Sequence, residues 1–345
     1  IRPPLVFAMV SAGYFHTCAL TTGGASYCWG EGGSGQLGDG GSSQRNSPVA
    51  VSGTQTFDRI SAGRSHSCGL TTSGAVYCWG SIPAAQSGTP AVVSGALTFA
   101  NVTAGYAHSC GVTTAGAGYC WGDNAAGGLG NGSLTATSVP GPVSGGLSFA
   151  SISPGRLFSC GLTTAGSGYC WGDNASGLLG DGTTTRRLTP VAISSQLTFT
   201  TISAGGFHAC ALTTAGAAYC WGFNETGQLG TGTRATSLSP APVSGGLTFV
   251  SLRAGNRHTC GVTASGAAYC WGDNTDGLLG NGTAAANSTT PTPVAGGLAF
   301  ASVSPARFHT CGVATNGAGY CWGDNRAGTL GDGTTQNSLV PAFVR

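Results

Sequence analysis

Lysine is absent from this sequence, and charge of either sign is scarce. All 13 basic residues are arginine, and only 7% of the 345 residues are charged, whereas roughly 25% is usual for a soluble globular chain. The arginines are scattered and the formal net charge is only +2. A nucleic-acid-binding protein normally carries a basic stripe or patch, so we expect no nucleic-acid partner.

Long apolar runs are also missing. No stretch approaches the roughly 20 apolar residues of a membrane-spanning helix, so we expect no membrane-spanning segment. The chain opens Ile-Arg-Pro-Pro without a signal peptide, as expected of a mature or excised product. Hydrophobic residues nevertheless make up 41% of the chain and glycine contributes 62 residues. This composition indicates a folded, turn-rich protein rather than a disordered one.

A repeat of about 50 residues fills the chain. The stretch HTCALTTGGASYCWG at 16–30 holds two cysteines ten positions apart, and close copies follow at 66–80 and 208–222. Seven copies contain all 14 cysteines and all seven tryptophans. The second copy lacks most of the long loop that follows Cys-Trp-Gly in the others. The pairs are Cys18 and Cys28, Cys68 and Cys78, Cys110 and Cys120, Cys160 and Cys170, Cys210 and Cys220, Cys260 and Cys270, and Cys311 and Cys321.

Each repeat contains four short apolar stretches separated by Gly, Pro and Ser/Thr turn signals. In the fifth repeat these are 197–203, 208–214, 217–222 and 240–243, and such stretches are typical of strands. Four strands per repeat, seven times, predict an all-β fold: a single seven-bladed β-propeller spanning residues 1–345. A β-solenoid is the alternative, but the units are too long and too hairpin-like for it. The expected repeats are 4–53, 54–95, 96–145, 146–195, 196–245, 246–296 and 297–345.

The repeat pattern A-G-x-x-H-x-C-A-L-T-T-x-G-x-x-Y-C-W-G-x-N-x-x-G-Q-L-G resembles the regulator of chromosome condensation repeat over nearly the whole chain. The resemblance implies a seven-bladed propeller, in agreement with the strand count. Functions in that family range from nucleotide exchange on a nuclear GTPase to ultraviolet sensing and secreted bacterial inhibition of β-lactamases, so the resemblance implies fold more than function. The family's usual unit lacks the cysteine pair, and we expect a secreted, bacterial-like variant.

The hairpin register explains the cysteine pairs. A three-residue turn at 22–24 places Cys18 opposite Cys28 and Ala19 opposite Tyr27. Directly opposed residues have Cα atoms about 4.5–5.5 Å apart, within the roughly 4.4–6.8 Å that a disulfide requires. Every repeat carries Ala or Gly at the position of Ala19 and Tyr at that of Tyr27, and this pairing of small with large side chains supports the same register. The sequence therefore predicts seven disulfides.

A zinc site is the main alternative use of the cysteines, with free thiols as a third. Six repeats have His two residues before the first Cys, which would supply three ligands of a tetrahedral site. The fourth repeat has Phe158 at that position yet keeps Cys160 and Cys170. The cysteines therefore do not depend on the histidine, and disulfides are favoured. Disulfides persist outside the reducing cytosol, so we expect an extracellular, cell-surface or periplasmic protein.

Chemistry-bearing constellations are few. No Cys-x-x-Cys occurs, which disfavours redox catalysis, and no nucleophile–base–acid set or phosphate-binding loop appears. The six histidines are expected to form hydrogen bonds to neighbouring backbone groups. The Asp/Asn-rich loop at 271–282 resembles a calcium loop, but its acidic positions vary between repeats, which favours a turn. We expect no enzyme activity, no cofactor and no metal.

The two variable residues within A-G-x-x-H are the candidate binding residues. By repeat symmetry, the seven loops that carry them lie on one rim of the ring. Arginine and aromatic residues, which are enriched at binding hot spots, predominate there; in the secreted inhibitor that this chain resembles, an aromatic-rich propeller face grips the partner. A simple cover for the channel mouth is the alternative role. The predicted rim residues are Tyr14, Phe15, Arg64, Tyr106, Arg156, Leu157, Phe207, Arg257, Arg307 and Phe308.

These features predict a binding or scaffold module that holds a protein partner, or another copy of itself, through this rim. Carbohydrate binding at repeated pockets between blades is the alternative from another class, so a glycan is the second candidate partner. An enzyme and a nuclear exchange factor are less favoured.

Overall fold

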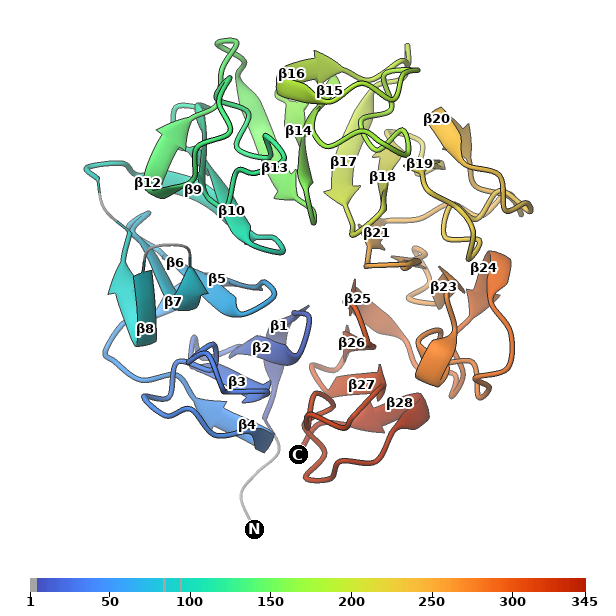
Figure 1. The fold of residues 1–345 in the computed structure, drawn as a ribbon. Helices are drawn as coiled ribbons and strands as arrows, with labels where there is room; N and C mark the ends of the chain where they lie inside the picture. Colours follow the sequence, from blue (N-terminus) through green and yellow to red (C-terminus); the bar gives the residue numbers. More distant parts are fainter. Residues whose placement is uncertain (1–4, 83–84, 94) are drawn as a thin grey trace.

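The computed structural model describes residues 5–82, 85–93 and 95–345 and confirms the predicted seven-bladed β-propeller. Seven four-stranded antiparallel sheets form a ring in which the chain runs once around the centre (Figure 1). Within each sheet the strands follow sequence order, with the first strand innermost and the fourth on the periphery (Figure 1). None of the described helices is long and apolar enough to cross a membrane.

The strands of the first four blades are β1 (Phe7–Ala12), β2 (His16–Thr21), β3 (Ser26–Gly30) and β4 (Arg45–Ala50); β5 (Phe57–Ala62), β6 (His66–Thr71), β7 (Val76–Ile82) and β8 (Ala85–Val92); β9 (Phe99–Ala104), β10 (His108–Thr113), β11 (Gly118–Gly122) and β12 (Thr137–Pro142); and β13 (Phe149–Pro154), β14 (Phe158–Thr163), β15 (Gly168–Gly172) and β16 (Arg187–Ala192). 

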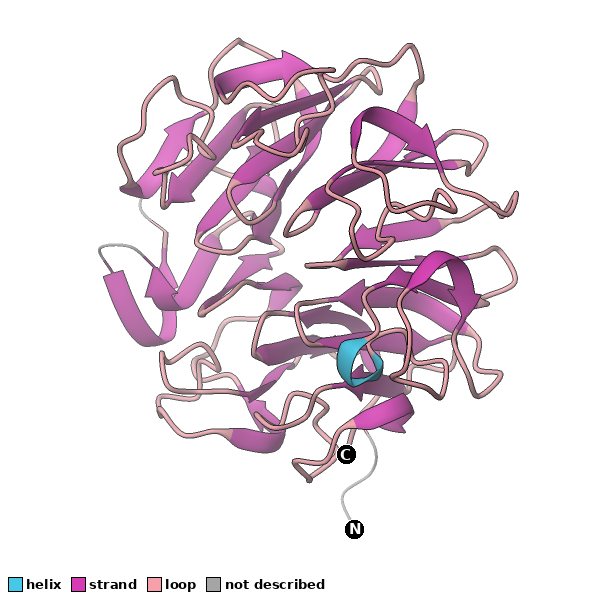
Figure 2. Ribbon diagram, turned by 45° about the vertical axis from the view of Figure 1, so that its right-hand side comes forward, coloured by secondary structure: helices cyan, strands magenta, loops and turns pink. Residues whose placement is uncertain are grey.

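The last three blades hold β17 (Phe199–Ala204), β18 (His208–Thr213), β19 (Ala218–Gly222) and β20 (Ser237–Pro242); β21 (Ser251–Ala254), β22 (His258–Val262), β23 (Ala268–Gly272) and β24 (Ser288–Pro293); and β25 (Phe300–Pro305), β26 (His309–Ala314), β27 (Gly319–Gly323) and β28 (Ser338–Phe343). A single 3-10 turn, η1 (Thr275–Gly277), lies in the long loop of the sixth blade (Figure 2).

The predicted hairpin register is confirmed. Cys18 pairs with Cys28 and Ala19 with Tyr27, and the turn at 22–24 ends on Gly24, whose φ of 82° favours glycine. The need for a small residue at the Ala19 position has a cause beyond the opposed tyrosine. At the equivalent Gly69, a Cβ would lie 2.5 Å from Cδ1 of Phe57 on the innermost strand, so this ring occupies the space that a larger side chain would need.

All seven predicted disulfides are present, one in each blade, and no described cysteine is free. The Cα atoms of Cys18 and Cys28 are 4.1 Å apart. Consecutive strand residues point to opposite faces of a sheet, so Cys28 and Trp29 in the Cys-Trp step serve different blade boundaries. The disulfide of each blade therefore packs toward the next blade, and its tryptophan packs toward the previous one.

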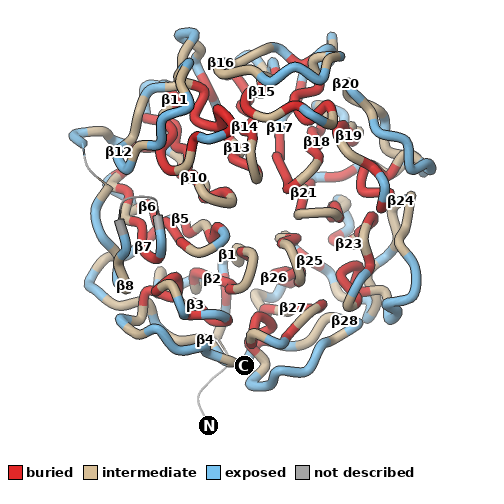
Figure 3. The backbone as a smooth tube through the Cα atoms, in the orientation of Figure 1, coloured by how far each residue is buried: buried red, intermediate tan, exposed pale blue. Residues whose placement is uncertain are grey.

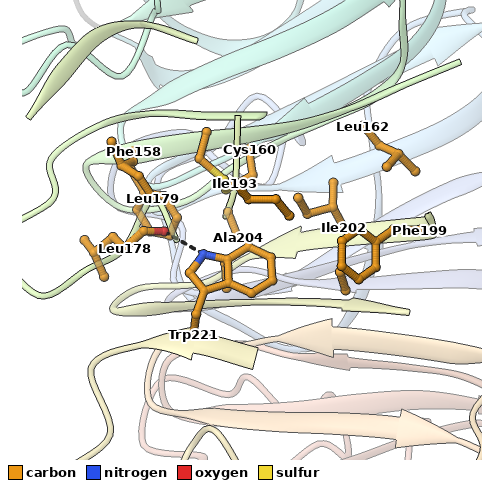
Figure 4. Close-up of a cluster of buried hydrophobic side chains, with 13 residues drawn as sticks. Phe158, Cys160, Leu162, Leu178, Leu179, Ile193, Phe199, Ile202, Ala204 and Trp221 are labelled. Atoms are coloured by element: carbon orange, nitrogen blue, oxygen red, sulfur yellow. Dashed lines mark hydrogen bonds between the residues drawn. A yellow bond between two sulfur atoms is a disulfide. The ribbon is translucent and has the colours of Figure 1, made fainter. Parts of the chain in front are cut away.

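Seven buried clusters fill the boundaries between blades. At the boundary of the fourth and fifth blades, the Cys160–Cys170 disulfide and Leu162 lie in one cluster with Phe199, Ile202 and Trp221 (Figure 4). The same arrangement recurs around the ring. The second strand of each blade is almost fully buried, the innermost strands have buried and accessible residues, and the peripheral strands are half-buried or exposed (Figure 3). The hydrophobic core is thus distributed among the blade boundaries.

The ring closes between the first and last blades without sharing a blade. β1 belongs wholly to the first sheet and β28 to the seventh. The Ala12 N–H donates to Oγ of Ser304 at 3.0 Å, and the Trp29 indole donates to the carbonyl of Thr329 at 2.8 Å. Phe7 and Trp29 also join the buried cluster of Cys311 and Cys321. The last boundary is therefore packed like the other six.

The histidines link blades to one another, which corrects the expectation of a backbone partner. Nε2 of His16 lies 2.8 Å from Oγ of Ser67 in the next blade. Because that hydroxyl donates to the carbonyl of Gln36, the imidazole is the donor in this bond. All six histidines lie against a Ser or Thr hydroxyl of the following blade: His16 with Ser67, His66 with Ser109, His108 with Ser159, His208 with Thr259, His258 with Thr310, and His309 with Thr17.

Candidate functional site

The predicted rim is built by the loops that join the first and second strands of each blade. In five of these loops, the N–H of the first variable residue donates to a backbone carbonyl in the next blade. For example, the Tyr14 N–H donates to the Gly63 carbonyl at 3.0 Å, and the Arg156 N–H donates to the Gly205 carbonyl at 3.2 Å. Backbone hydrogen bonds from loop to loop thus hold the rim side chains in fixed relative positions. The donors are Tyr14, Tyr106, Arg156, Gly206 and Asn256.

Arginines and aromatic rings alternate across the rim from the second to the sixth blade. The guanidinium carbon of Arg64 lies 4.7 Å from the centre of the Tyr106 ring, and that of Arg156 lies 5.5 Å from the same ring centre. Arg156 also lies 4.9 Å from the centre of the Phe207 ring. Arg257 continues the series at 5.5 Å from the same Phe207 ring. Such cation–π contacts fix otherwise flexible guanidinium groups over rigid rings.

A second group covers the seventh and first blades. The Arg307 guanidinium lies 4.4 Å from the Phe308 ring centre, and the Phe308 ring lies 5.4 Å from that of Phe15. Tyr14 connects this group to the first series, since its ring meets the edge of Tyr106 at 4.8 Å. We call the combined arginine and aromatic side chains the rim ladder. It comprises Tyr14, Phe15, Arg64, Tyr106, Arg156, Phe207, Phe223, Arg257, Arg307 and Phe308.

Tyr14 also helps to cover the channel mouth. Its hydroxyl donates to Oδ1 of Asn256 at 3.3 Å, so contacts cross the ring from the first blade to both Tyr106 and Asn256. Burial raises the pKa of the Tyr14 phenol well above its ordinary value, although nearby guanidinium groups oppose the shift. The phenol therefore remains a protonated donor. Tyr14 therefore has the alternative role predicted for the rim residues, that of covering the channel mouth.

The rim ladder remains accessible. Arg64 is exposed and the other ladder side chains predicted from the sequence are half-buried. None of the four ladder arginines forms an ion pair with a residue that the structure describes. Beside the ladder lies a cavity of about 410 Å³, whose wall includes Arg156, Phe207 and Phe308 together with Asp273. The rim thus offers cations and apolar rings beside a depression.

Sequence reasoning missed two members of this region. Phe223 stands where five of the other six repeats have an acidic residue, and its ring lies 5.6 Å from the Arg257 guanidinium and 6.1 Å from the Phe207 ring. Asn256 is one of the variable loop residues but is neither arginine nor aromatic. The sequence signal for Phe223 was the aromatic residue itself, which replaces the acidic residue that most repeats carry directly after Cys-Trp-Gly. Conversely, no ring or hydrogen-bond contact in the described residues joins the Leu157 side chain to the ladder.

The Asp/Asn-rich loops use their oxygens internally. Nδ2 of Asn174 donates to Oδ1 of Asp181 and to the carbonyls of Thr183 and Thr185, while its Oδ1 accepts the Leu179 N–H at 2.9 Å. Equivalent bonds surround Asn124 and Asn325 and pin each long loop over the blade boundary. The repeated Asn is therefore explained by loop structure.

The histidines lie away from any accessible surface. His16 and its five equivalents are buried, and desolvation lowers the pKa of His16 to about 3 and that of His66 to about 4. Both are therefore neutral at pH 7. Their hydrogen bonds to the next blade account for their recurrence in the sequence, and burial prevents contact with a substrate.

Comparison with known proteins places the chain in a family. The family model of the RCC1-like domain matches residues 2–249, and models of the regulator of chromosome condensation (RCC1) repeat match 249–278 and 265–313. The chain belongs to the RCC1-like family. This assignment confirms the resemblance seen in the repeat pattern.

Several solved structures have a similar fold. Human WBSCR16 is 19% identical with a TM-score of 0.83, over 93% of this chain and 94% of that chain. Prp20p from Saccharomyces cerevisiae, described with its binding properties to Gsp1p and histones, is 20% identical with a TM-score of 0.83, over 99% and 87%. The ectodomain of the Arabidopsis thaliana receptor kinase ACR4 is 22% identical with a TM-score of 0.62, over 99% of both chains. These likenesses concern the fold.

Proposed function

We propose that this RCC1-like propeller is a binding module that holds a protein partner through the rim ladder. The observation that carries the proposal is the alternation of Arg64, Tyr106, Arg156 and Phe207 across successive blades, with no ion pair from either arginine to a carboxylate in the described part of the chain. Arginine and aromatic side chains dominate binding hot spots because they combine large apolar area with directed polar groups.

The physical state of the ladder supports binding. Stacking on the rings restricts each guanidinium before a partner arrives, which reduces the entropy lost on association. The guanidinium N–H groups remain free to donate to carboxylates, which accept them in bidentate fashion. We therefore expect the partner surface to present acidic and apolar side chains together, with the cavity beside Phe207 and Phe308 receiving a protruding side chain.

The disulfides support a location outside the cytosol. Seven bridges, each within one blade, persist where thiols are not kept reduced. We propose that the protein acts in the extracellular space, on a cell surface or in a periplasm.

Capture from an extract of the native source tests the function. We expect the unchanged protein to retain a partner, identified by mass spectrometry, that the triple variant Arg156→Ala/Phe207→Ala/Phe308→Ala fails to retain. A matched control, Val139→Ala/Arg234→Ala/Leu238→Ala, removes one arginine and two apolar side chains from exposed positions of the periphery. Equal capture by the rim variant, or equal loss in the control, would contradict the proposal.

The partner held by the rim ladder could instead be a second copy of the chain, which is tested on the purified protein. In that case, sedimentation velocity should show an oligomer for the unchanged protein and the control variant and a monomer for the rim variant. Carbohydrate binding between blades is less favoured: one pocket of about 390 Å³ lies between the fifth and sixth blades, beside Thr213 and Thr248, but buried side-chain clusters fill the interior of the blade boundaries. Binding on a glycan array that survives in the rim variant would instead favour that function.

A further inference from the structure

The central channel below the rim has a different chemistry. Each innermost strand ends at the rim, so the first residues of the strand, such as Phe57–Arg59 in β5, lie toward the opposite end. The strands surround a cavity of about 380 Å³ that extends along the channel as far as their last residues, such as Ala62 and Ala254, which also line the space directly under the rim. Its wall consists mainly of Ser, Thr, Asn and small apolar side chains, and it contains two arginines, Arg59 and Arg253. No acidic side chain belongs to this wall among the described residues.

A ring of serines explains most of the polar wall. In five blades, a serine Oγ accepts the N–H of an alanine in the next blade at 3.0 Å: Ser11 from Ala62, Ser61 from Ala104, Ser153 from Ala204, Ser203 from Ala254, and Ser304 from Ala12. These bonds satisfy backbone donors that would otherwise have no partner at the blade boundaries.

Two blades depart from this ring in a correlated way. Thr103 and Arg253 stand at the serine position, and the next blade carries Pro154 and Pro305 where the alanine would be. Proline has no N–H to donate, so neither boundary needs a serine acceptor. Arg253 is therefore released from the structural task of its position. Its guanidinium forms no hydrogen bond or ion pair with any residue in the described parts of the chain.

Arg59 is almost as free. Its one charged neighbour is Asp58, 3.8 Å away at the edge of the ion-pair range, and both side chains are more than half exposed, so this contact contributes little. The Arg253 side chain is accessible to solvent within the channel, and both the surrounding channel walls and the positive charge of Arg59 lower its pKa. Both arginines line one cavity whose described wall contains no acidic side chain.

We propose that this cavity binds a multivalent oxyanion, a phosphate or sulfate group, at Arg253 and Arg59. Guanidinium groups bind such oxyanions through paired N–H donors, and a cleft lined by one sign of charge concentrates ions of the other sign. Hydroxyl groups such as that of Ser251, next to Arg253 on the wall, add neutral donors. Because Tyr14, Tyr106 and Asn256 meet across the rim end, the anion enters from the opposite end.

Isothermal titration at constant ionic strength tests the site, with sodium chloride as the balancing salt. The probes are inorganic phosphate, inorganic sulfate and glycerol 3-phosphate, which distinguish a free ion from a phosphate group on a larger molecule. We expect the unchanged protein to bind at least one probe and Arg253→Ser, which restores the usual residue of this position, to bind it at least about tenfold more weakly. Arg59→Ser should weaken binding as well, whereas Arg186→Ser, an equal charge change at an exposed peripheral position, should not.

The site would be ruled out if none of the three probes bound the unchanged protein. It would also be ruled out if Arg253→Ser and Arg59→Ser bound the probe as tightly as the unchanged protein does. Equal weakening in Arg186→Ser would show an effect of net charge alone and would also overturn the proposal. Circular dichroism of each variant checks the fold, and the rim variant described above should retain full anion affinity because none of its three positions lines the cavity.

Discussion

Phe158 and Ala209 lie together in the buried cluster between the fourth and fifth blades, at the one boundary of the seven where a histidine does not meet a hydroxyl. Every other boundary has His in the first blade and Ser or Thr in the second. Both members of the pair change together, so neither an imidazole nor a hydroxyl is left without its partner. A buried polar group without a partner costs roughly 1–3 kcal/mol, which accounts for the joint change.

This pairing predicts the outcome of a double-mutant cycle at His66 and Ser109. His66→Phe alone removes the imidazole partner of the buried Ser109 hydroxyl, and Ser109→Ala alone leaves the buried Nε2 of His66 without its hydroxyl partner. Each single change should lower the free energy of unfolding by about 1–3 kcal/mol. The double variant, which copies Phe158 and Ala209, should be more stable than the sum of the two losses implies. Urea unfolding of the four proteins measures the coupling; strictly additive losses would contradict it.

The histidines also predict a loss of stability in mild acid. Burial lowers their pKa values to about 3 or 4 in the folded protein, whereas an unfolded histidine has an ordinary pKa of about 6.5. The unfolded chain therefore binds more protons as pH falls below 6.5, and each histidine removes about 1.4 kcal/mol per pH unit down to its folded pKa. Thermal unfolding between pH 7 and 4.5 should show a steep fall in melting temperature.

The His66→Phe/Ser109→Ala variant provides the matched control for this acid effect. It retains five of the six histidines, so its melting temperature should fall less steeply with pH. Above pH 4.5 the carboxyl groups, with ordinary pKa values of about 4, contribute little to the change. A pH dependence that is the same in both proteins would show that the histidines are not its source.

The two tryptophans Trp121 and Trp171 should respond differently to replacement by phenylalanine. The Trp171 indole donates to the Gly128 carbonyl in the long loop of the previous blade at 2.8 Å. Trp121 lies in the third blade and packs toward the second, which lacks most of the long loop. Its buried Nε1–H has no partner in the described structure. Trp171→Phe should therefore cost about 1 kcal/mol more than Trp121→Phe, measured by urea unfolding. Equal costs would mean that the indole bond contributes nothing.

Each disulfide should stabilise its blade by restricting the unfolded chain. For a ten-residue separation, the chain-entropy account gives about 3 kcal/mol per bridge. Guanidinium unfolding of Cys68→Ala/Cys78→Ala should show a loss of that size or greater, since the variant also removes buried sulfur. Chemical reduction breaks the cross-link but leaves both sulfur atoms in the protein. The unfolding free energy of the reduced protein therefore reports the contribution of the cross-link without the loss of buried sulfur. The intact mass should rise by 14 hydrogens on full reduction, in line with the 14 paired cysteines.

The hairpin at 16–30 shows how far a repeat sequence predicts structure. Turn length and alternation determine which residues oppose each other, so the Cys18–Cys28 pair and the small residue opposite Tyr27 could both be predicted. The strand limits were less certain, because the fourth strand of the fifth blade begins at Ser237, earlier than the apolar stretch 240–243. Polar residues can occupy this peripheral strand because none of its side chains is fully buried.

Contacts between blades could not be predicted in the same way. The partner of His16 is Ser67, 51 positions away, and a period alone does not say which groups meet across a boundary. The rim loops were placed correctly on one side by symmetry, but the stacking of Arg257 on Phe223 depends on the packing of two adjacent loops. Arg253 was overlooked because its departure from serine gains meaning only beside Pro305 of the next blade.

The most direct test of the account is photo-crosslinking from the rim. Leu157 sits among the ladder residues without contributing a ring or ion contact, so a photoreactive amino acid there leaves the ladder intact; Val139, exposed on the periphery, is the control position. In an extract of the native source, we predict that position 157 crosslinks to a partner protein and position 139 does not. Crosslinks from 139 alone, or from neither position, would contradict the assignment of the rim as the binding surface.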